Sequence, residues 1–435
     1  MPAGSPSSTP LALSLNDAIR RGLQTNLGLL TRANSSAEAR AQRVRALSAL
    51  LPQVTGTLGE TAEQLNLKTL GINFHFPPIP GFPGIPTIVG PFEYTAAQAS
   101  ITAKVFDWNA LKNLSSARAN EEAARLSVQD ARDLVIQAVV NGYLEIIASA
   151  SRVASIQAQV NTAQAIYDRA GDQHKAGTSP AIDVLRAQVE LKTQQQRSLA
   201  QQNQFDKDKL TLARVIGLPP GQPFDVADRV PFAPLSGLTQ EEALRTALAQ
   251  RPDYQSAREA VRSAEEALRA ARAQWYPTVG INGFYGDEGP TLASSHGVFA
   301  LTAALNFNIF NGGRIRGDIE QARAVLKQRS DELADWGSQI DFQVRTAFLD
   351  IRTAADLVAV AQANLQLANE TLQQAQDRFR AGVADTIEVV QAQESVAAAN
   401  DSIISALYAH NVAKAALARA LGLAEQGIQK FIEVK

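Results

Sequence analysis

Residues that commonly carry chemistry are few and scattered in this chain of 435 residues. There is no cysteine, which excludes disulfides, thiolate nucleophiles and cysteine-ligated metals. Neither a glycine-rich phosphate loop nor a serine–histidine–acid arrangement occurs in the sequence. The four histidines are far apart, and none has another ligand-type residue four positions away: His75, His174, His296 and His410. The sequence therefore predicts a protein that is not an enzyme and has no cofactor or metal site.

Two carboxylates occupy matching places and could act through their charge. Asp183 follows Gly177 by six residues, and Glu388 follows Gly382 by six residues. A carboxylate in the first turn of a helix interacts favourably with the helix dipole. Several copies of one carboxylate around a narrow axis would instead repel, raise one another's pKa and select cations. The sequence leaves both roles open.

Composition narrows the class of protein. The 41 basic and 43 acidic residues give a net charge of −2 and no basic footprint, so nucleic acid is not expected as a partner. No stretch reaches about 18 consecutive apolar residues, which predicts that no helix spans a membrane. Residues 1–12 lack the pattern of an export signal and are expected to form a disordered leader, with any signal already removed.

The elements that would position these residues begin with strands in which apolar and polar side chains alternate. In 97–105, alanine, isoleucine and valine share one parity, while glutamine, serine, threonine and lysine share the other. Segment 298–310 alternates in the same way. Such strands have one apolar and one wetter face. Seven residues are expected to face lipid: Phe299, Leu301, Leu305, Phe307, Ile309, Ile101 and Val105.

Long helical patterns follow these strands. The pattern from Arg314 to about Arg380 contains no proline and would extend about 100 Å, far more than an ordinary globular helix. Apolar residues recur at alternating spacings of three and four, as in coiled-coil seams. Many seam positions are alanine, for example Ala163, Ala375 and Ala392, so neighbouring helices can approach closely. The polar remaining faces suit a wall with water on both sides.

One helix–strand–strand–helix–helix unit is written twice in the chain. Leu13–Ile19 matches Leu238–Leu244 at an offset of 225, and Gly177 matches Gly382 at 205. The first repeat, 13–218, is expected to contain helices 14–51, 109–175 and 180–216, and strands at about 53–74 and 94–107. The second, 238–423, is expected to contain helices 239–275, 314–380 and 385–421, and strands at about 278–286 and 298–310. A linker, 219–237, joins the repeats, and 424–435 forms a tail.

Taken together, the order, duplication and spacing of these motifs resemble the TolC family of outer-membrane efflux channels. The resemblance covers 13–423. It rests also on the junctions Val105-Phe106-Asp107-Trp108 and Ile309-Phe310-Asn311-Gly312-Gly313-Arg314, and on the hairpin tips Lys175-Ala176-Gly177-Thr178 and Arg380-Ala381-Gly382-Val383. It implies a mainly α protein in which a membrane β-barrel continues as a long periplasmic coiled-coil tunnel.

The resemblance also implies a homotrimer, which physical reasoning favours independently. Four strands cannot close a barrel, and open sheet edges are not tolerated in lipid, so several chains must contribute. Three chains would supply 12 strands, an even number within the range of outer-membrane barrels.

By the same resemblance, the chain would be a passive exit duct of a tripartite efflux or type I secretion system. Its partners would be outer-membrane lipid, a periplasmic adaptor and an inner-membrane pump. The adaptor would dock at the hairpin tips, through Gly177, Thr178, Gly382 and Val383, although glycine is also the usual residue of a helical turn. Drug, metal-ion and polypeptide cargoes are not distinguished.

A constriction is implied at the same tips, formed by four residues: Glu388, Asp183, Gln391 and Phe379. The two carboxylates match acidic positions of the family, but Gln391 does not, and Phe379 replaces a tyrosine. Ala384 stands where the family has an arginine. We therefore expect any closed state to rest on packing around Val389 and Ala392.

The alternative function is a periplasmic structural or adaptor-like coiled coil that never enters lipid. Such a protein has no use for alternating strands in matching repeats. A porin acting alone would leave the long helices, which make up most of the chain, without a role.

Overall fold

The computed structural model describes residues 9–71, 86–228, 230–235, 237–381, 383–384 and 386–432. The chain divides into two compact units. The sheet unit comprises 38–121 and 260–329, and the helical unit comprises 1–37, 122–259 and 330–435. Each is built from both sequence repeats.

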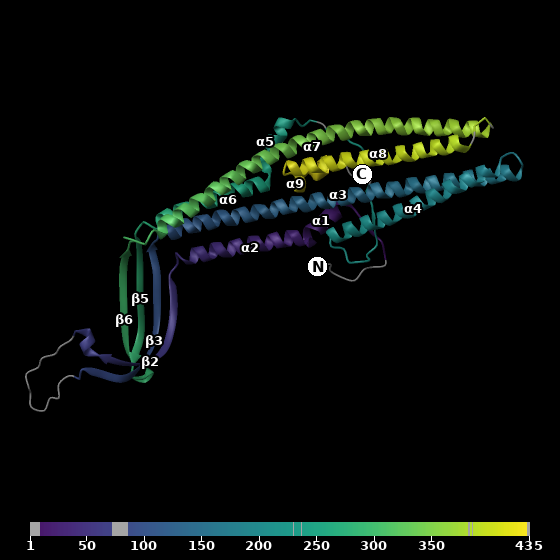
Figure 1. Cartoon of the computed structure of the whole chain (residues 1–435). Coiled ribbons are helices and arrows are strands. Elements are labelled where there is room, and N and C mark those ends of the chain that lie inside the picture. The colour runs from purple at the N-terminus through teal and green to yellow at the C-terminus, as the bar shows by residue number, and fades with distance from the viewer. Residues whose placement is uncertain are drawn as a thin grey trace, which may run out of the picture. The chain divides into compact units, whose positions relative to one another are not determined.

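Four antiparallel strands form the centre of the sheet unit (Figure 1). They are β2 (Gln53–Asn66), β3 (Ile88–Phe106), β5 (Thr278–Gly289) and β6 (His296–Asn306), in the spatial order β2–β3–β5–β6. In the described part of the chain this sheet is open, with β2 and β6 as its edges. Strand β6 is shorter than expected, so Phe307 and Ile309 lie beyond it. Beyond the strand, the side chain of Asn308 donates to the Gln274 carbonyl at 2.9 Å.

The strand register collects apolar side chains on one face of the sheet. Ile101 pairs with Gly283, which pairs in turn with Leu301. Side chains of directly paired residues point to the same face. A Cβ at Gly283 would lie 2.9 Å from the Leu301 side chain, so this glycine leaves room for its two neighbours. The pair Asn282 and Thr302 lies on the opposite face.

Helices pack on small polar residues beside the sheet. Here α3 (Trp108–Lys175) lies against α6 (Pro252–Ala273), while α2 (Leu27–Ser48) and α7 (Arg314–Arg380) complete the unit. Ser116 and Ser263 each donate to the other's backbone carbonyl, at 2.9 and 3.0 Å. Lys112 and Glu266 form an ion pair at 3.0 Å on the same two helices. Small residues at the contact allow this close approach.

Helices dominate the other unit. They are α1 (Leu15–Thr25), α4 (Ala181–Val215), α5 (Gln240–Gln250), α8 (Thr386–Ala420) and α9 (Ala424–Phe431), with parts of α2, α3, α6 and α7. Residues 1–8 of the expected leader, 1–12, lie outside the described chain. Its last residues belong to a strand, because β1 (Leu11–Leu13) pairs in parallel with β4 (Phe224–Val226) of the linker. The expected tail contains α9.

Two helices that the sequence predicted as continuous are each broken in two. Asn26 separates α1 from α2, and Arg251 separates α5 from α6; both residues have extended backbone. Proline disfavours helical geometry in the residue before it, and Pro252 follows Arg251. The side chain of Asn26 accepts from the Gly28 N–H at 2.9 Å, so it caps the second helix. We call these two breaks the elbows.

The element bounds recur at the same offsets as the sequence repeat. Helices α5 and α6 begin and end 225 residues after α1 and α2. Helix α8 begins and ends 205 residues after α4. The expected alanine seams are also confirmed, because the side chains of these residues are buried: Ala163, Ala170, Ala368, Ala375, Ala392, Ala399 and Ala406.

One described helix, α3, contains an 18-residue window that is long and apolar enough to cross a membrane, contrary to expectation. Half of that window is buried inside the protein. Residues Val139, Val140 and Ile146 of α3 belong to the main core, together with α1, α4, α8 and α9. Because a buried core helix passes the same test, the window is weak evidence for a membrane-spanning helix.

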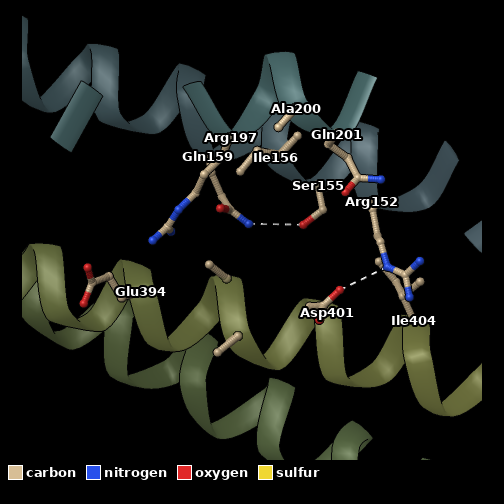
Figure 2. A pocket seen from close by; sticks show the side chains of 12 residues that line it. Arg152, Ser155, Ile156, Gln159, Arg197, Ala200, Gln201, Glu394, Asp401 and Ile404 are labelled. Atoms are coloured by element: carbon tan, nitrogen blue, oxygen red, sulfur yellow. Dashed lines mark hydrogen bonds and ion pairs between the residues drawn. The ribbon is translucent and has the colours of Figure 1, made fainter. Parts of the chain in front are cut away.

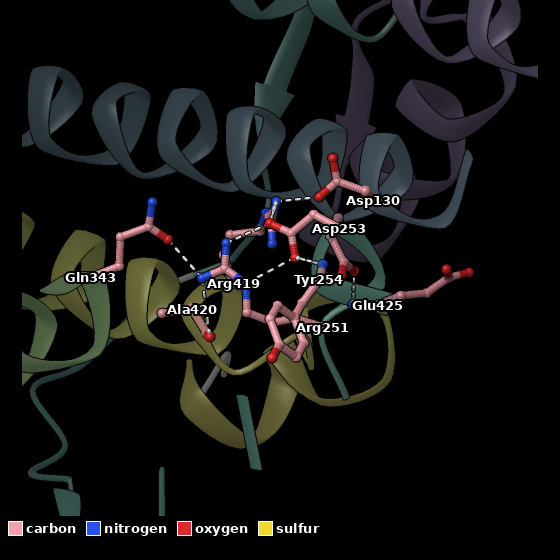
Figure 3. A network of polar contacts seen from close by, with 9 residues as sticks. Asp130, Arg251, Asp253, Tyr254, Gln343, Arg419, Ala420 and Glu425 are labelled. Carbon is pink, nitrogen blue, oxygen red and sulfur yellow. Dashed lines mark hydrogen bonds and ion pairs between the residues drawn. The ribbon is translucent and has the colours of Figure 1, made fainter. Parts of the chain in front are cut away.

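A buried polar network joins α3, α6, α7 and α8 at the break between α5 and α6 (Figure 3). Arg251 makes two hydrogen bonds to Asp253, at 3.0 and 2.6 Å, and a third to Gln343 at 2.6 Å. Arg419 forms an ion pair with Asp130 and lies 3.6 Å from Asp253. Breaking one member of such a buried set leaves an uncompensated charge, which costs about 3–5 kcal/mol.

Asp133 lies beside this network and is held differently. Its carboxylate accepts the N–H of Glu425, in the first turn of α9, at 3.1 Å. Burial raises the pKa of Asp133 to about 6, although the charge of Arg419 opposes that shift. For Asp253, burial is outweighed by the hydrogen bonds and charge of Arg251, so its pKa is lowered. The contributions of Asp133 and Asp253 to folding stability therefore change with pH in opposite directions.

A glycine ends the last helix of each repeat and packs against an elbow. Gly217 and Gly422 both have positive φ, of 65° and 71°. A Cβ on Gly422 would lie 2.8 Å from the Cα of Arg251, and one on Gly217 would lie 2.5 Å from the Cβ of Thr25. The Leu423 N–H donates to the Ala418 carbonyl at 2.9 Å, which completes the helix cap. No other residue type fits this combination of backbone angle and space.

We expect Gly422→Ala to destabilise the helical unit far more than Gly177→Ala. Gly177 has a similar φ of 73°, but a Cβ there meets open space. Both variants bear the left-handed strain of about 1–2 kcal/mol. Only Gly422→Ala adds overpacking of about 1–3 kcal/mol. Thermal unfolding of the detergent-solubilised variants measures the difference, and equal shifts of the midpoint would contradict the packing role of Gly422.

A second prediction concerns the pH dependence of stability. The pKa of Asp133 is higher in the folded state than the ordinary 3.8, so its contribution to stability grows as the pH falls through about 6. Asp133→Asn keeps the acceptor and removes the charge, and should stabilise the protein by about 1–3 kcal/mol near neutral pH and by less near pH 4.

Asp253→Asn provides the matched control, because the lowered pKa of Asp253 gives the opposite sign. It should destabilise near neutral pH, with a loss that shrinks as the pH falls. Unfolding midpoints measured across that pH range distinguish the two variants. If both variants destabilise the protein near neutral pH, burial does not control the contribution of Asp133 to stability.

Candidate functional site at the hairpin tips

The tip of the first helical hairpin, between α3 and α4, is a glycine-capped turn. Gly177 donates its N–H to the His174 carbonyl at 2.9 Å. Thr178 donates both its N–H and its hydroxyl to the Gln173 carbonyl, each at 2.9 Å. Positive φ at Gly177 permits this pair of bonds. The turn is exposed and presents Thr178 to solvent.

The tip of the second hairpin, between α7 and α8, repeats the main bond of the first. Val383 donates its N–H to the Arg378 carbonyl at 3.0 Å, 205 residues after the bond between Thr178 and Gln173. The side chain of Val383 is exposed. Gly382 was expected to take part in docking, and it lies outside the described residues.

His174, at the tip of the first hairpin, does not pack into the seam. Its side chain is exposed, and Nδ1 lies 2.9 Å from the Ser179 carbonyl oxygen. The residue at the equivalent place, Phe379, is partly buried. A polar ring reaches the turn carbonyl from this position, whereas an apolar ring remains in the seam.

Both candidate acidic residues lie in the first turn of a returning helix. Asp183 lies in α4, and its carboxylate is 3.7 Å from the guanidinium of Arg186. Glu388 lies in α8, and its Oε1 is 3.0 Å from Nε of Arg378 on α7. The second ion pair crosses the hairpin. Spacing in the sequence did not identify Arg378 as the partner of Glu388, because Arg378 precedes the tip glycine, whereas the family's arginine position, here Ala384, follows it.

A small apolar cluster joins the two hairpins close to their tips. Its buried members are Ala375, Val389 and Ala392. Ile166 of α3 and Phe379 of α7 pack against them, so the cluster joins helices from both repeats. The guanidinium of Arg169 lies 5.9 Å from the centroid of the Phe379 ring, within the range of a cation–π contact.

An apolar groove of about 370 Å³ runs between α4 and α8 behind the tips. Its walls carry five aliphatic side chains: Ile182, Leu185, Val189, Ile387 and Val390. Gln391, expected in the constriction, lines this groove together with Arg186 and Glu190. An exposed apolar surface of this kind is typical of a protein contact rather than of a solvated wall.

A second, polar cavity of about 650 Å³ lies between α3, α4 and α8 (Figure 2). Arg152 links α3 to α8 across it, through Asp401 at 3.1 Å and Ser405 at 3.1 Å. Arg197 and Glu394 extend from opposite walls. Among the described residues, no group of three metal-ligating side chains occurs here or elsewhere.

Comparison with known proteins identifies the group to which this architecture belongs. A family model described as "Outer membrane efflux protein" matches residues 18–218 and 243–423. The pyoverdine export outer membrane protein OpmQ of Pseudomonas aeruginosa is 24% identical, over 94% of this chain and 85% of its own length. The toluene efflux pump outer membrane protein TtgC of Pseudomonas putida is 24% identical, over 70% of this chain and 63% of its own.

Solved structures agree in fold. The outer membrane channel CmeC of Campylobacter jejuni superposes with a TM-score of 0.81 at 16% identity, covering 96% of this chain and 88% of that one. These matches confirm the outer-membrane location and the efflux function that the sequence predicted. They favour that function over the alternative, a periplasmic coiled coil that does not enter lipid. Because the family model matches both repeats, this chain belongs to the outer membrane efflux protein family.

Proposed function

We propose that this protein is the exit duct of a tripartite efflux or type I secretion system, conducting cargo passively through the outer membrane as a homotrimer. The observation that carries the proposal is the open four-stranded sheet with one apolar face. In lipid, each unpaired backbone group costs about 3 kcal/mol or more, so the edge strands β2 and β6 require partner strands. Three copies supply 12 strands, enough for a closed barrel.

The apolar sheet face supports a lipid contact for the strand residues. Phe299, Leu301 and Leu305 of β6 are all largely exposed in the single chain, as is Val105 of β3. Ile101 shares their face through the strand register. Phe307 and Ile309, also exposed, follow the strand and lie next to the start of α7, where they would meet the edge of the lipid layer.

Exposed apolar residues along α7 support the assembly of several copies. Phe342, Leu349, Val360 and Leu367 are each more than half exposed in the single chain. Large apolar side chains repeated along one long helix support an interaction surface there. In the trimer, a helix of the neighbouring copy covers this stripe, and the tunnel wall is continuous.

The tips supply the surface for a periplasmic adaptor. Gly177, Thr178 and Val383 form exposed turns, and the groove between α4 and α8 offers aliphatic side chains directly behind them. A helical hairpin of the adaptor fits such a groove through a row of apolar side chains. The inner-membrane pump attached to that adaptor provides the energy, because the channel conducts passively.

The tips also form the constriction. Three copies of Glu388 around the tunnel axis would repel one another, and the ion pair with Arg378 reduces that repulsion. Asp183 provides a second acidic position, held by Arg186. The buried packing of Val389 and Ala392 supports a closed state that rests on the apolar cluster and on Phe379.

The test of the proposed function uses two neighbouring arginine substitutions in β6. Leu301→Arg places a charge on the lipid face at the centre of β6 and should cost about 2–4 kcal/mol near the bilayer midplane. Thr302→Arg places it on the opposite face and should cost little. The yield of trimer in detergent, measured by light scattering, distinguishes them. A monomer that needs no detergent, or equal loss of trimer in both variants, would contradict the proposal.

The constriction is tested by single-channel recording in planar bilayers under a salt gradient. If Glu388 lines the constriction, Glu388→Gln should weaken the cation preference, while Arg378→Gln should strengthen it by exposing the carboxylate. Asp183→Asn provides the comparison at the position of the first hairpin that corresponds to Glu388 in the second. Reversal potentials that stay unchanged in both of the first two variants would instead assign Glu388 to capping α8.

A further inference from the structure

Residues 230–235 form a strap that touches three separate apolar clusters of the helical unit. Val230 packs on the cluster of α1, α3 and α4. Phe232 packs on Val358 and Ala406 of α7 and α8, and Leu235 packs on the cluster of α5 and α7. The strap sequence, Val-Pro-Phe-Ala-Pro-Leu, contains no charged residue. Its position therefore depends on apolar packing and on a few polar contacts from below.

His410 of α8 lies directly beneath the strap. Its side chain is fully buried, and its ring lies 4.7 Å from the ring of Phe232, centroid to centroid. Neither ring nitrogen has a hydrogen-bond partner among the described residues. One turn along α8, buried Lys414 donates Nζ to the Ala233 carbonyl at 3.0 Å. Two strap residues are thus held by two side chains of one helix face.

This surrounding favours a neutral imidazole. Burial lowers the pKa of His410, and the charge of Lys414 lowers it further. Among the described groups, Lys414 is the charge that acts on His410; the strap has none, and the α7 residues of the cluster are apolar. A second positive charge here would be unsolvated and repelled by the first. No carboxylate contact compensates it within the described structure.

The direction of the pH effect follows from linkage. A histidine whose pKa is lowered by folding contributes stability that is present above its ordinary value of 6.5 and is lost as the pH falls below it. Asp133, whose pKa is raised, has the opposite effect. The contribution of His410 can therefore be separated from the rest of the network.

We propose that His410 is an acid-sensitive latch: its protonation expels the Phe232 ring and releases the strap 230–235 from α7 and α8. Loss of the contact between the Phe232 and His410 rings also exposes the Ala233 carbonyl, which accepts the hydrogen bond from Lys414. Release frees α7 and α8 from a segment that also packs on the α1 and α5 clusters, through Val230 and Leu235. The channel wall at this level would then loosen in acid and tighten near neutral pH.

A single introduced thiol can report strap release, because the full chain contains no cysteine. Ala233→Cys places the thiol in the strap, where the Ala233 side chain is 9% exposed. Leu199→Cys, in a separate variant, gives an exposed reference at a residue that is 74% exposed. Both detergent-solubilised proteins are labelled with 4,4′-dithiodipyridine, which reacts in acid, at about pH 7.5 and about pH 5. The ratio of the two labelling rates cancels the intrinsic pH dependence of the thiol.

The ratio should rise about tenfold between neutral and acid pH, since protonation of a site with a lowered pKa changes the opening constant by that order. In the His410→Phe background, which keeps an aromatic contact but cannot ionise, the ratio should change less than about twofold. A wild-type ratio that stays constant, or an acid-induced rise that persists in His410→Phe, would overturn the latch.

Hydrogen exchange provides a second readout that needs no thiol in the strap. The amides of Phe232 and Ala233 should exchange faster in acid, after correction for intrinsic rates, in the wild type and not in His410→Phe. Asp133→Asn should leave this difference intact, because Asp133 lies outside the cluster beneath Phe232. If Asp133→Asn removes the difference and His410→Phe does not, the pH response belongs to the polar network and the latch is rejected.

Discussion

The contact between Gly422 and the α5–α6 elbow is the constraint on which the rest of the helical unit depends. The end of α8 approaches the backbone of Arg251 so closely that no side chain fits at position 422. This approach buries Arg251 and aligns its guanidinium with Asp253 and Gln343. Gly217 makes the corresponding contact with Thr25 in the first repeat. Both halves of the duplicated unit are thus closed by the same device, a helix cap packed against a broken helix.

Away from these contacts the helices are held in a different way. Toward the tips, the hairpins meet through alanines such as Ala375 and Ala392 and through few polar bridges, of which Arg152 with Asp401 is one. Alanine seams give close packing but little buried area, so each contact contributes modestly. A wall of this type is stabilised strongly in one zone and weakly in the other.

The charges of the helical unit are arranged for position rather than for reaction. Arg251, Arg419 and their carboxylate partners are buried and paired, while the ion pairs at the tips, such as Arg378 with Glu388, remain partly exposed. Buried pairs fix geometry because separating them is costly. Exposed pairs are screened by salt and exchange partners easily. The same residue types therefore act as fixed supports in one zone and as a tunable surface in the other.

The sequence alone determined the repeat, the strands and the seams, because these depend on periodicities that local geometry imposes. The alternation of apolar residues around Ile101 and Leu301 places them on one face in the folded sheet, because successive side chains point to opposite faces in any strand. The alanine seams survive for the same reason at helical spacing. The break at Arg251 was not predicted, although Pro252 follows it and disfavours helical backbone in the preceding residue.

Only the tertiary structure decided which residues meet across the chain. Arg378 faces Glu388, Gly422 touches Arg251, and His410 lies under Phe232 because hairpins and elbows have a particular register in space. Periodicity states which face a residue occupies but not which distant residue that face contacts. The burial that shifts the pKa of a carboxyl or an imidazole arises from those distant contacts, so it could not be predicted from spacing alone.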